Sequence, residues 1–312
     1  MLVVVRLMAL GLAAAIAASG APGDLGMAVV RGDGRLQPLA GQDGAAWSTL
    51  ASASAGGQWQ LWLFDDPVVR TSPFAARAAR SISAAAAPSP ASACLSTSGL
   101  EAGLIASPNA PASAAAGAPP PLGLALRGPE IRPDLPVAIA ADSELGRQLA
   151  MRAAAASHRA EDETLTLEAE ELPAGFPRFA VRRERPVTWT VMVRQGAATA
   201  ASKTYYLEGR KDYDGFRGRT DIGRIRTTGH VFLQMTGQRE IIDAEVDLSD
   251  VEGHQSVFRT PLAILAWPAR TVWLFATRGP DGGTFEIVEL TTGTGRPRTV
   301  WQGPDGCAPT PR

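Results

Sequence analysis

The segment GHVFLQMTGQREIIDAEVDLSDVEG, residues 229–253, decides the fold of this chain. In its second part apolar and polar residues alternate without a break. The apolar positions are Ile242, Ala244, Val246 and Leu248, and the polar ones are Asp243, Glu245, Asp247 and Ser249. A period of two with one apolar side is typical of a β-strand with one face on a core. A second apolar run precedes the turn-like TGQ, so the segment predicts an antiparallel pair.

Further strand patterns fill the second half of the chain, at residues 186–195, 202–215, 258–267, 270–279 and 283–292. GPDGG, residues 279–283, is a hairpin turn sequence. The alternation in PVTWTVMVRQ, residues 186–195, predicts one shared face for Val187, Trp189, Val191 and Val193.

The first half also has strand patterns, separated by Ala/Pro-rich stretches. Met27–Arg31 and Arg35–Ala40 flank the turn residues GDG and predict a hairpin. QWQLWLFDDP, residues 58–67, is apolar on both faces, which indicates a strand buried on both sides. We expect shorter strands at Arg80–Ala87, Leu100–Ile105 and Leu122–Leu126, and an Ala/Pro-rich loop at 107–121.

One helix is predicted in the middle of the chain, over residues 142–162. Asp142 or Ser143 can cap it, and Leu145, Leu149 and Ala153 recur at helical spacing. The charged HRAEDET, residues 158–164, reads as surface.

We therefore expect a mainly β protein with antiparallel sheets, arranged as a sandwich or a partly open barrel, with one mid-chain helix and long Ala/Pro-rich loops. The expected regions are an N-terminal β region at 24–141, the connecting helix at 142–162 and a C-terminal antiparallel β region at 163–312.

Residues 1–19 have the pattern of a secretory signal peptide. Arg6 precedes an apolar run from Leu7 to Ala18, and small residues follow. An uncleaved anchor is the alternative. No later stretch reaches about 18 unbroken apolar residues. We expect a periplasmic or secreted protein without an integral membrane segment after cleavage.

Export would place the two cysteines, Cys94 and Cys307, in an oxidising compartment. Their disulfide would close a loop of 213 residues (307 − 94) and contribute up to about 5 kcal/mol by the chain-entropy argument. Two free thiols or a metal pair are the alternatives, although two cysteines cannot complete a tetrahedral zinc site.

The charge of the chain excludes one class of partner. The formal net charge is −1, which gives no electrostatic reason to expect nucleic acid. Only Lys203 and Lys211 are lysines among the 30 basic residues. Since lysine has AT-rich codons and arginine GC-rich ones, this bias indicates a GC-rich, bacterial genome.

Catalytic and cofactor motifs are absent from the sequence: it has no G-x-S-x-G, no H-E-x-x-H, no phosphate loop and no dinucleotide fingerprint. We expect no cofactor. The three histidines, His158, His230 and His254, read as surface residues.

Three weaker patterns carry candidate sites. Asp212, Asp214 and Asp221 can offer oxygens to a calcium ion, or form an acidic loop balanced by neighbouring arginines. Asp243, Glu245 and Asp247 share one strand face and suit acid–base work or sugar binding, or are simply solvated. Of the seven tryptophans, Trp47 and Trp301 are the surface candidates, and those expected in the core are Trp59, Trp62, Trp189, Trp267 and Trp273.

GRLQPLAGQDGAAW, Gly34 to Trp47, resembles a recurring element in uncharacterised exported proteins of GC-rich bacteria. Those proteins are also similar in a mid-chain cysteine and a β-rich end that finishes in a cysteine. The resemblance implies export and the disulfide, and it implies no activity.

The function we expect is a non-enzymatic structural or binding role in the periplasm or cell envelope, with an envelope protein or a glycan as partner. One alternative is a hydrolase acting on polysaccharide or cell-wall material through carboxylates such as Asp243 and Glu245. Another is a carbohydrate- or peptide-binding module that uses an exposed tryptophan.

Overall fold

The structure is a computed structural model, and it describes only part of the chain. The described residues are 25–31, 35–44, 46–51, 57–64, 76–84, 97–98, 123–128, 133–167, 172, 176–196, 203–213, 225–236, 239–250, 258–267, 269–279, 282–291 and 296–305.

The protein is mainly β, with three antiparallel sheets and one long mid-chain helix, α1 (Glu144–Leu167), as the sequence predicts. The N-terminal sheet has the order β3-β2-β1-β7-β4-β5-β6, the helix-covered sheet β12-β11-β10-β9-β8, and the middle sheet β13-β14-β15-β16. The strands of the N-terminal sheet are β1 (Leu25–Val30), β2 (Leu36–Asp43), β3 (Ala46–Thr49), β4 (Gly57–Phe64), β5 (Ala76–Ala84), β6 (Thr97–Ser98) and β7 (Gly123–Arg127). Those of the helix-covered sheet are β8 (Pro136–Ala138), β9 (Thr188–Gln195), β10 (Lys203–Tyr213), β11 (Ile225–Thr236) and β12 (Arg239–Asp250). The middle sheet consists of β13 (Phe258–Trp267), β14 (Arg270–Gly279), β15 (Gly282–Thr291) and β16 (Arg298–Pro304).

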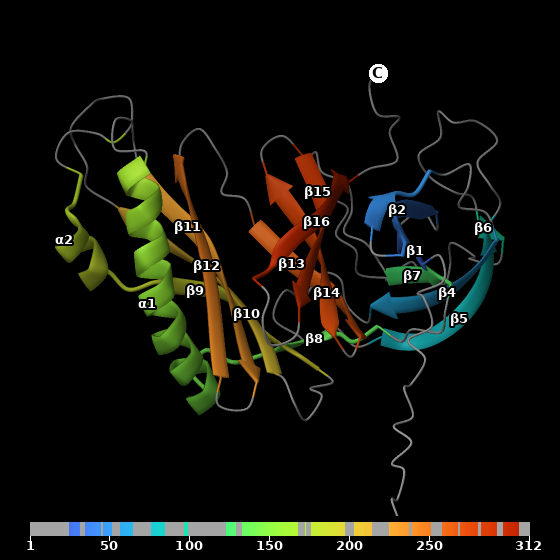
Figure 1. Ribbon diagram of the computed structural model, residues 1–312, viewed down its shortest axis with the longest axis horizontal. Helices are drawn as coiled ribbons and strands as arrows, with labels where there is room; N and C mark the ends of the chain where they lie inside the picture. The colour runs from blue at the N-terminus through green and yellow to red at the C-terminus, as the bar shows by residue number, and fades with distance from the viewer. Residues whose placement is uncertain are drawn as a thin grey trace, which may run out of the picture.

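These elements stack in four layers, from α1 through the helix-covered sheet and the middle sheet to the N-terminal sheet (Figure 1). The middle sheet is therefore covered on both faces. On β14, Val272 and Leu274 face the N-terminal sheet, whereas Trp273 and Phe275 face the helix-covered sheet. Continuous apolar runs in the sequence arise here because alternate side chains enter two different cores.

The segment 229–253 forms the outer part of the helix-covered sheet. β11 and β12 form the predicted antiparallel pair, with His230 opposite Glu245. Ile242 and Ala244 pack toward α1, and Asp243 and Glu245 lie on the other face of β12. The alternation is therefore confirmed, and the face with carboxylates is the one turned toward the middle sheet.

The N-terminal strands also follow the sequence prediction. β1 and β2 form the expected antiparallel hairpin. Trp59, Leu61 and Trp62 of β4 are all buried, which confirms a strand covered on both faces.

Helix α1 begins as predicted but continues beyond residue 162. The Ser143 hydroxyl caps it by accepting a hydrogen bond from the Gly146 amide at 3.0 Å. Leu149 and Ala153 pack on the helix-covered sheet, whereas Leu145 is partly exposed. Glu161 is buried, so the reading of 158–164 as surface is wrong at this position.

Five elements were not predicted: the strands β3, β6, β8 and β16 and the helix α2. β8 pairs with β9, so residues 136–138 belong to the helix-covered sheet. They precede α1 in the chain, whereas the other strands of this sheet follow it. The short helix α2 (Phe179–Glu184) precedes β9 and contacts α1.

A β-bulge in β9 overturns the predicted single face of residues 187–193. Val191 pairs with Glu208 and Trp189 with Gly209, which leaves Thr190 as an extra residue. Val191 and Val193 consequently face the middle sheet, while Trp189 packs on the side of α1.

Several expectations concern residues outside the described ranges: the signal sequence at 1–19, the disulfide between Cys94 and Cys307, the strand at Leu100–Ile105, and the loop at 107–121. Within the described ranges, neither helix has the length and apolar character that a membrane crossing needs.

Candidate functional site

Buried polar side chains gather on both faces of the helix-covered sheet. The helix-side cluster consists of His158, Glu161, Arg182, Lys211, Tyr213 and Thr227. The inter-sheet cluster, on the opposite face, consists of Tyr206, Glu208, His230, Glu245, Arg259 and Glu286. Both clusters include residues of β10 and β11, because alternate residues of a strand point to opposite faces of the sheet.

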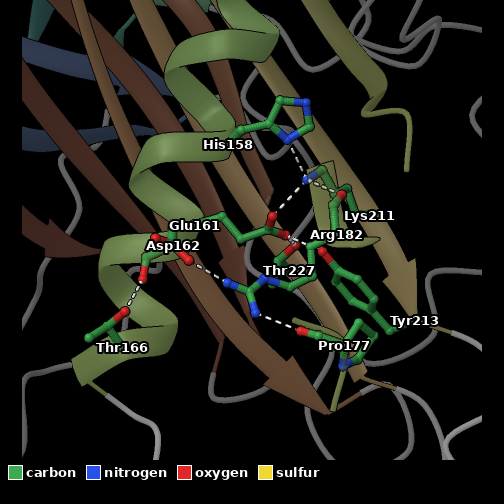
Figure 2. Close-up of polar contacts among 9 residues, drawn as sticks. All are labelled: His158, Glu161, Asp162, Thr166, Pro177, Arg182, Lys211, Tyr213 and Thr227. Atoms are coloured by element: carbon green, nitrogen blue, oxygen red, sulfur yellow. Dashed lines mark hydrogen bonds and ion pairs between the residues drawn. The ribbon is translucent and has the colours of Figure 1, made fainter. Parts of the chain in front are cut away.

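The helix-side cluster is built around Glu161 of α1 (Figure 2). Its Oε2 accepts a hydrogen bond from Lys211 Nζ at 2.6 Å. Its Oε1 accepts from the Tyr213 hydroxyl at 2.6 Å and from the Thr227 hydroxyl at 2.7 Å. The side chains of Glu161 and Lys211 are 2% and 3% exposed, so this is a buried ion pair with both carboxylate oxygens satisfied.

The ammonium group of Lys211 is also fully used. Besides Glu161, it contacts His158 Nδ1 at 2.7 Å and donates to the main-chain carbonyl of Arg182 at 3.3 Å. Burial lowers the pKa of Lys211, and the Glu161 carboxylate opposes that effect. The bonds of Glu161 and Lys211 thus connect α1, α2 and β10.

His158 lies well inside α1, not at its end, and is half-buried against Lys211. Burial and the Lys211 charge lower the pKa of His158. Arg182 continues the network from α2, since its guanidinium pairs with Asp162 and donates to the Pro177 carbonyl (Figure 2).

The inter-sheet cluster begins as a row across three neighbouring strands. Glu208 of β10 stands opposite His230 of β11, and His230 stands opposite Glu245 of β12. The row runs from the interior to the surface, because Glu208 is 4% exposed and the side chain of Glu245 is 62% exposed. The carboxylate of Glu245 lies 3.6 Å from His230 Nε2.

Arg259 of β13 joins this row to the middle sheet. Its main-chain amide donates to Glu208 Oε2 at 3.0 Å, and its Nε lies 3.0 Å from Glu286 Oε2. Its NH1 group lies 2.9 Å from His230 Nδ1. One arginine therefore contacts two carboxyl groups and the imidazole.

The carboxyl group of Glu208 is unevenly satisfied. Oε2 accepts from the Tyr206 hydroxyl at 2.9 Å and from the Arg259 amide. Within the described part of the chain, no hydrogen-bond partner is found for Oε1, although this atom is buried. Burial raises the pKa of Glu208 to about 7, and the bonds from Tyr206 and Arg259 oppose the shift.

His230 is the counterpart of Glu208. Burial, together with the Arg259 charge, lowers the pKa of His230 to about 3, so the imidazole is neutral at physiological pH. The expectation of a surface histidine is wrong, because His230 lies within β11 and not at its start. The signal that points to it is its place in the alternation of 229–236, on the same face as Phe232.

The predicted carboxylate stripe of β12 forms the open end of the row. Burial raises the pKa of both Asp243 and Glu245, and the mutual repulsion of the stripe adds to the shift of Glu245. Asp243 has a distant ion pair with Arg296, at 3.9 Å. The sequence pattern thus located these residues, whereas it did not reveal Glu208, Arg259 or Glu286 behind them.

The calcium hypothesis is only partly addressed by the structure. Asp212 is described, and its Oδ1 accepts from Arg226 Nε at 2.6 Å. Asp214, Asp221 and also His254 lie outside the described residues. Within the described ranges, no group of three or more His, Cys, Asp or Glu side chains is placed to hold a metal ion.

The tryptophans lie mostly in the core. Trp59, Trp62 and Trp273 are buried, as predicted. The two surface candidates are not exposed: Trp301 is buried and donates from Nε1 to the Thr49 hydroxyl at 3.1 Å, and Trp47 packs against the same core. The rings of Trp47 and Trp301 pack in the core between the middle and N-terminal sheets.

Comparison of the chain with protein-family models, with curated proteins and with solved structures gives no match. The functional argument therefore depends on the geometry of the inter-sheet cluster.

Proposed function

We propose that the protein is exported and has a non-enzymatic binding role in the periplasm or cell envelope. Its contact surface is the carboxylate face of β12, formed by Asp243, Glu245 and Asp247. The observation that carries this proposal is the row of side chains from buried Glu208 through His230 to exposed Glu245.

The surface favours a partner that offers hydrogen-bond donors or positive charge. Burial, and after it the like charges of Asp247 and Asp243, raise the pKa of Glu245, and a ligand donor or cation would stabilise the carboxylate. Behind the surface, Arg259 and His230 hold the base of the row in one arrangement. A contact surface backed by a rigid polar network suits binding, because its geometry is formed before the partner arrives.

A hydrolase is the second candidate, since Glu208 would act as an acid and Glu245 as a base. The two residues are two strands apart on one face, which corresponds to about 10 Å. Glu208 is nevertheless 4% exposed and packed against the middle sheet, so a substrate would have to open that interface to reach it. Binding at the outer carboxylates needs no such access.

The binding test compares purified wild-type chain with the D243N/E245Q variant on arrays of envelope glycans and of basic and acidic peptides. The control is E144Q, which removes an exposed carboxylate at the start of α1. We expect one ligand class to bind wild type and E144Q but not D243N/E245Q. Equal binding by all three, or cleavage of a glycan by wild type, contradicts the proposal.

Export is tested separately by fractionation of cells that express the full chain. We expect the chain in the periplasm or medium, with residues 1–19 removed and with Cys94 and Cys307 protected from alkylation until a reductant is added. A full-length cytoplasmic chain with two reactive thiols would contradict export.

A further inference from the structure

The interface between the helix-covered and middle sheets has an aromatic core and a polar rim. Tyr206 packs against Phe275 across it, with ring centroids 4.8 Å apart. Phe232 and Trp273 meet edge to face at 5.9 Å. Glu208 is adjacent to these rings, since it lies two residues after Tyr206 on the same face of β10.

Several buried polar atoms in this interface have no hydrogen-bond partner within the described ranges. They are Glu208 Oε1 on one side and, on the facing side of β14, Thr271 Oγ1, Trp273 Nε1 and Thr277 Oγ1. Buried polar atoms without partners are costly, and they bond readily to any water that enters.

This arrangement favours the neutral form of the Glu208 carboxyl group over the ionised form. A carboxylate can accept about four hydrogen bonds, but Glu208 receives two, both at Oε2. The nearest cation, Arg259, already contacts Glu286 at 3.0 Å and His230 at 2.9 Å. A negative charge on Glu208 would therefore be poorly compensated unless water entered the interface.

We propose that Glu208 is a proton-controlled latch between the two sheets. With the carboxyl neutral, the interface is dry and closed. Loss of the proton draws water to Oε1 and loosens β13 and β14 from β10 and β11. This device goes beyond the proposed binding role and does not depend on it.

The groups that face Glu208 set the direction of this response. They are Tyr206 and Arg210 on β10, His230 on β11, Glu245 on β12, Arg259 on β13 and Glu286 on β15. Glu245 and Glu286 oppose ionisation of Glu208, while Arg259 favours it. His230 has the opposite proton dependence, because its protonation would place a second cation beside Arg259.

The latch lies at the inner end of a row of polar side chains that reaches the surface. Glu245 is exposed, His230 lies 3.6 Å behind it, and Arg259 lies beside His230. Glu161, on the other face of the sheet, provides the matched comparison: it is equally buried, but both of its oxygens are bonded and Lys211 neutralises it.

The test measures hydrogen exchange of the segments 258–267 and 270–279 between pH 5 and 8, with intrinsic exchange rates divided out. Wild type is compared with E208Q, which cannot ionise, and with E161Q. We expect the protection of E208Q relative to wild type to grow more than about tenfold over this range, because ionisation is coupled to opening. We expect no such growth for E161Q relative to wild type.

Equal pH dependence in wild type and E208Q would overturn the proposal. Should E208Q not fold, the carboxyl ¹³C signal of Glu208 in wild type serves as the second measurement. A midpoint near 7 supports the latch, and one near the ordinary value of 4.5 overturns it.

Discussion

Two glutamates, Glu161 and Glu208, lie buried on opposite faces of the helix-covered sheet, and their environments differ in one respect. Glu161 has a cation, Lys211, at 2.6 Å, and hydroxyl donors at its other oxygen. Within the described ranges, Glu208 has donors at Oε2 alone, and its neighbouring cation is shared with Glu286. A negative charge on Glu161 is therefore compensated by Lys211, whereas burial raises the pKa of Glu208 to about 7.

Removing the cation from the helix-side cluster should be costly. In K211M, Glu161 keeps its two hydroxyl partners but loses its counter-charge, so we expect the free energy of unfolding to fall by about 3–5 kcal/mol. Urea denaturation measures the loss.

The control for K211M is the double variant E161Q/K211M, which removes both charges. Its loss of stability should be clearly smaller than the sum of the two single losses. Additive losses would show that Lys211 and Glu161 do not form the pair described.

At this scale the sequence was a limited guide. The alternation of 242–249 identified the carboxylate stripe, but a charged residue such as Glu161 in a polar run reads as surface. Its partners, Lys211 and Tyr213, come from a strand 50 residues away or more, so local pattern could not pair them with it.

At the scale of the elements, the bulge in β9 determines which apolar core each of its residues enters. By inserting Thr190 it lets Trp189 cover the side of α1 while Val191 and Val193 enter the inter-sheet core. The ring of Trp189 lies over Gly209, where a Cβ atom would come within 2.8 Å of Trp189 Cε3 and 2.6 Å of Val187 Cγ1. A glycine is required there for space.

The variant G209A should therefore displace Trp189 or Val187. We expect the free energy of unfolding to fall by about 1–3 kcal/mol, as for other overpacked sites. The control is G41A in β2, whose added methyl would meet Leu50 Cδ1 at an ordinary 3.5 Å. Thermal unfolding of both variants checks this, and equal melting temperatures would contradict the packing described.

Most strands were predicted because each leaves an apolar run or a period of two in its own sequence, whereas β3, β6, β8 and β16 were missed. The bulge was not predictable, since residues 187–191 alternate without a break and only the pairing with Glu208 and Gly209 reveals the extra residue. The extension of α1 and the short β8 were missed for the related reason that their partners are distant in the chain.

At the scale of the whole molecule, the middle sheet binds the layers together. Its outer face meets the N-terminal sheet, where Arg31 pairs with Asp305 and Gln37 donates to the Pro304 carbonyl at 2.7 Å. The isolated bridge between Asp134 and Ile264 joins it to the segment before β8. The sequence predicted packed sheets, but not which sheets would be neighbours.

We expect the buried ion pair Arg31–Asp305 to contribute more to the free energy of unfolding than an exposed ion pair does. Its side chains are 7% and 5% exposed, so D305N would leave a buried guanidinium without a counter-charge. We expect a loss of about 3 kcal/mol in the free energy of unfolding. E289Q, which breaks the more exposed pair with Arg270, should cost less than about 1 kcal/mol. Urea denaturation of D305N and E289Q measures the two losses, and equal losses would contradict this ranking.

The inter-sheet cluster should make the free energy of unfolding of the whole molecule depend on pH. Between pH 4.5 and 6.5 the folded chain binds an extra proton at Glu208 relative to the unfolded chain, so this group alone makes stability fall with rising pH. His230 binds a proton less, so it alone makes stability rise over the same window. The two slopes nearly cancel.

Urea denaturation of wild type, E208Q and H230Q at several pH values from 4.5 to 6.5 tests this most directly. Between pH 4.5 and 6.5 we expect the free energy of unfolding of E208Q to rise by about 2 kcal/mol relative to wild type, and that of H230Q to fall by a similar amount relative to wild type. Parallel curves for the three proteins would contradict the claim that Glu208 enters the folded state as an acid and His230 as a neutral base.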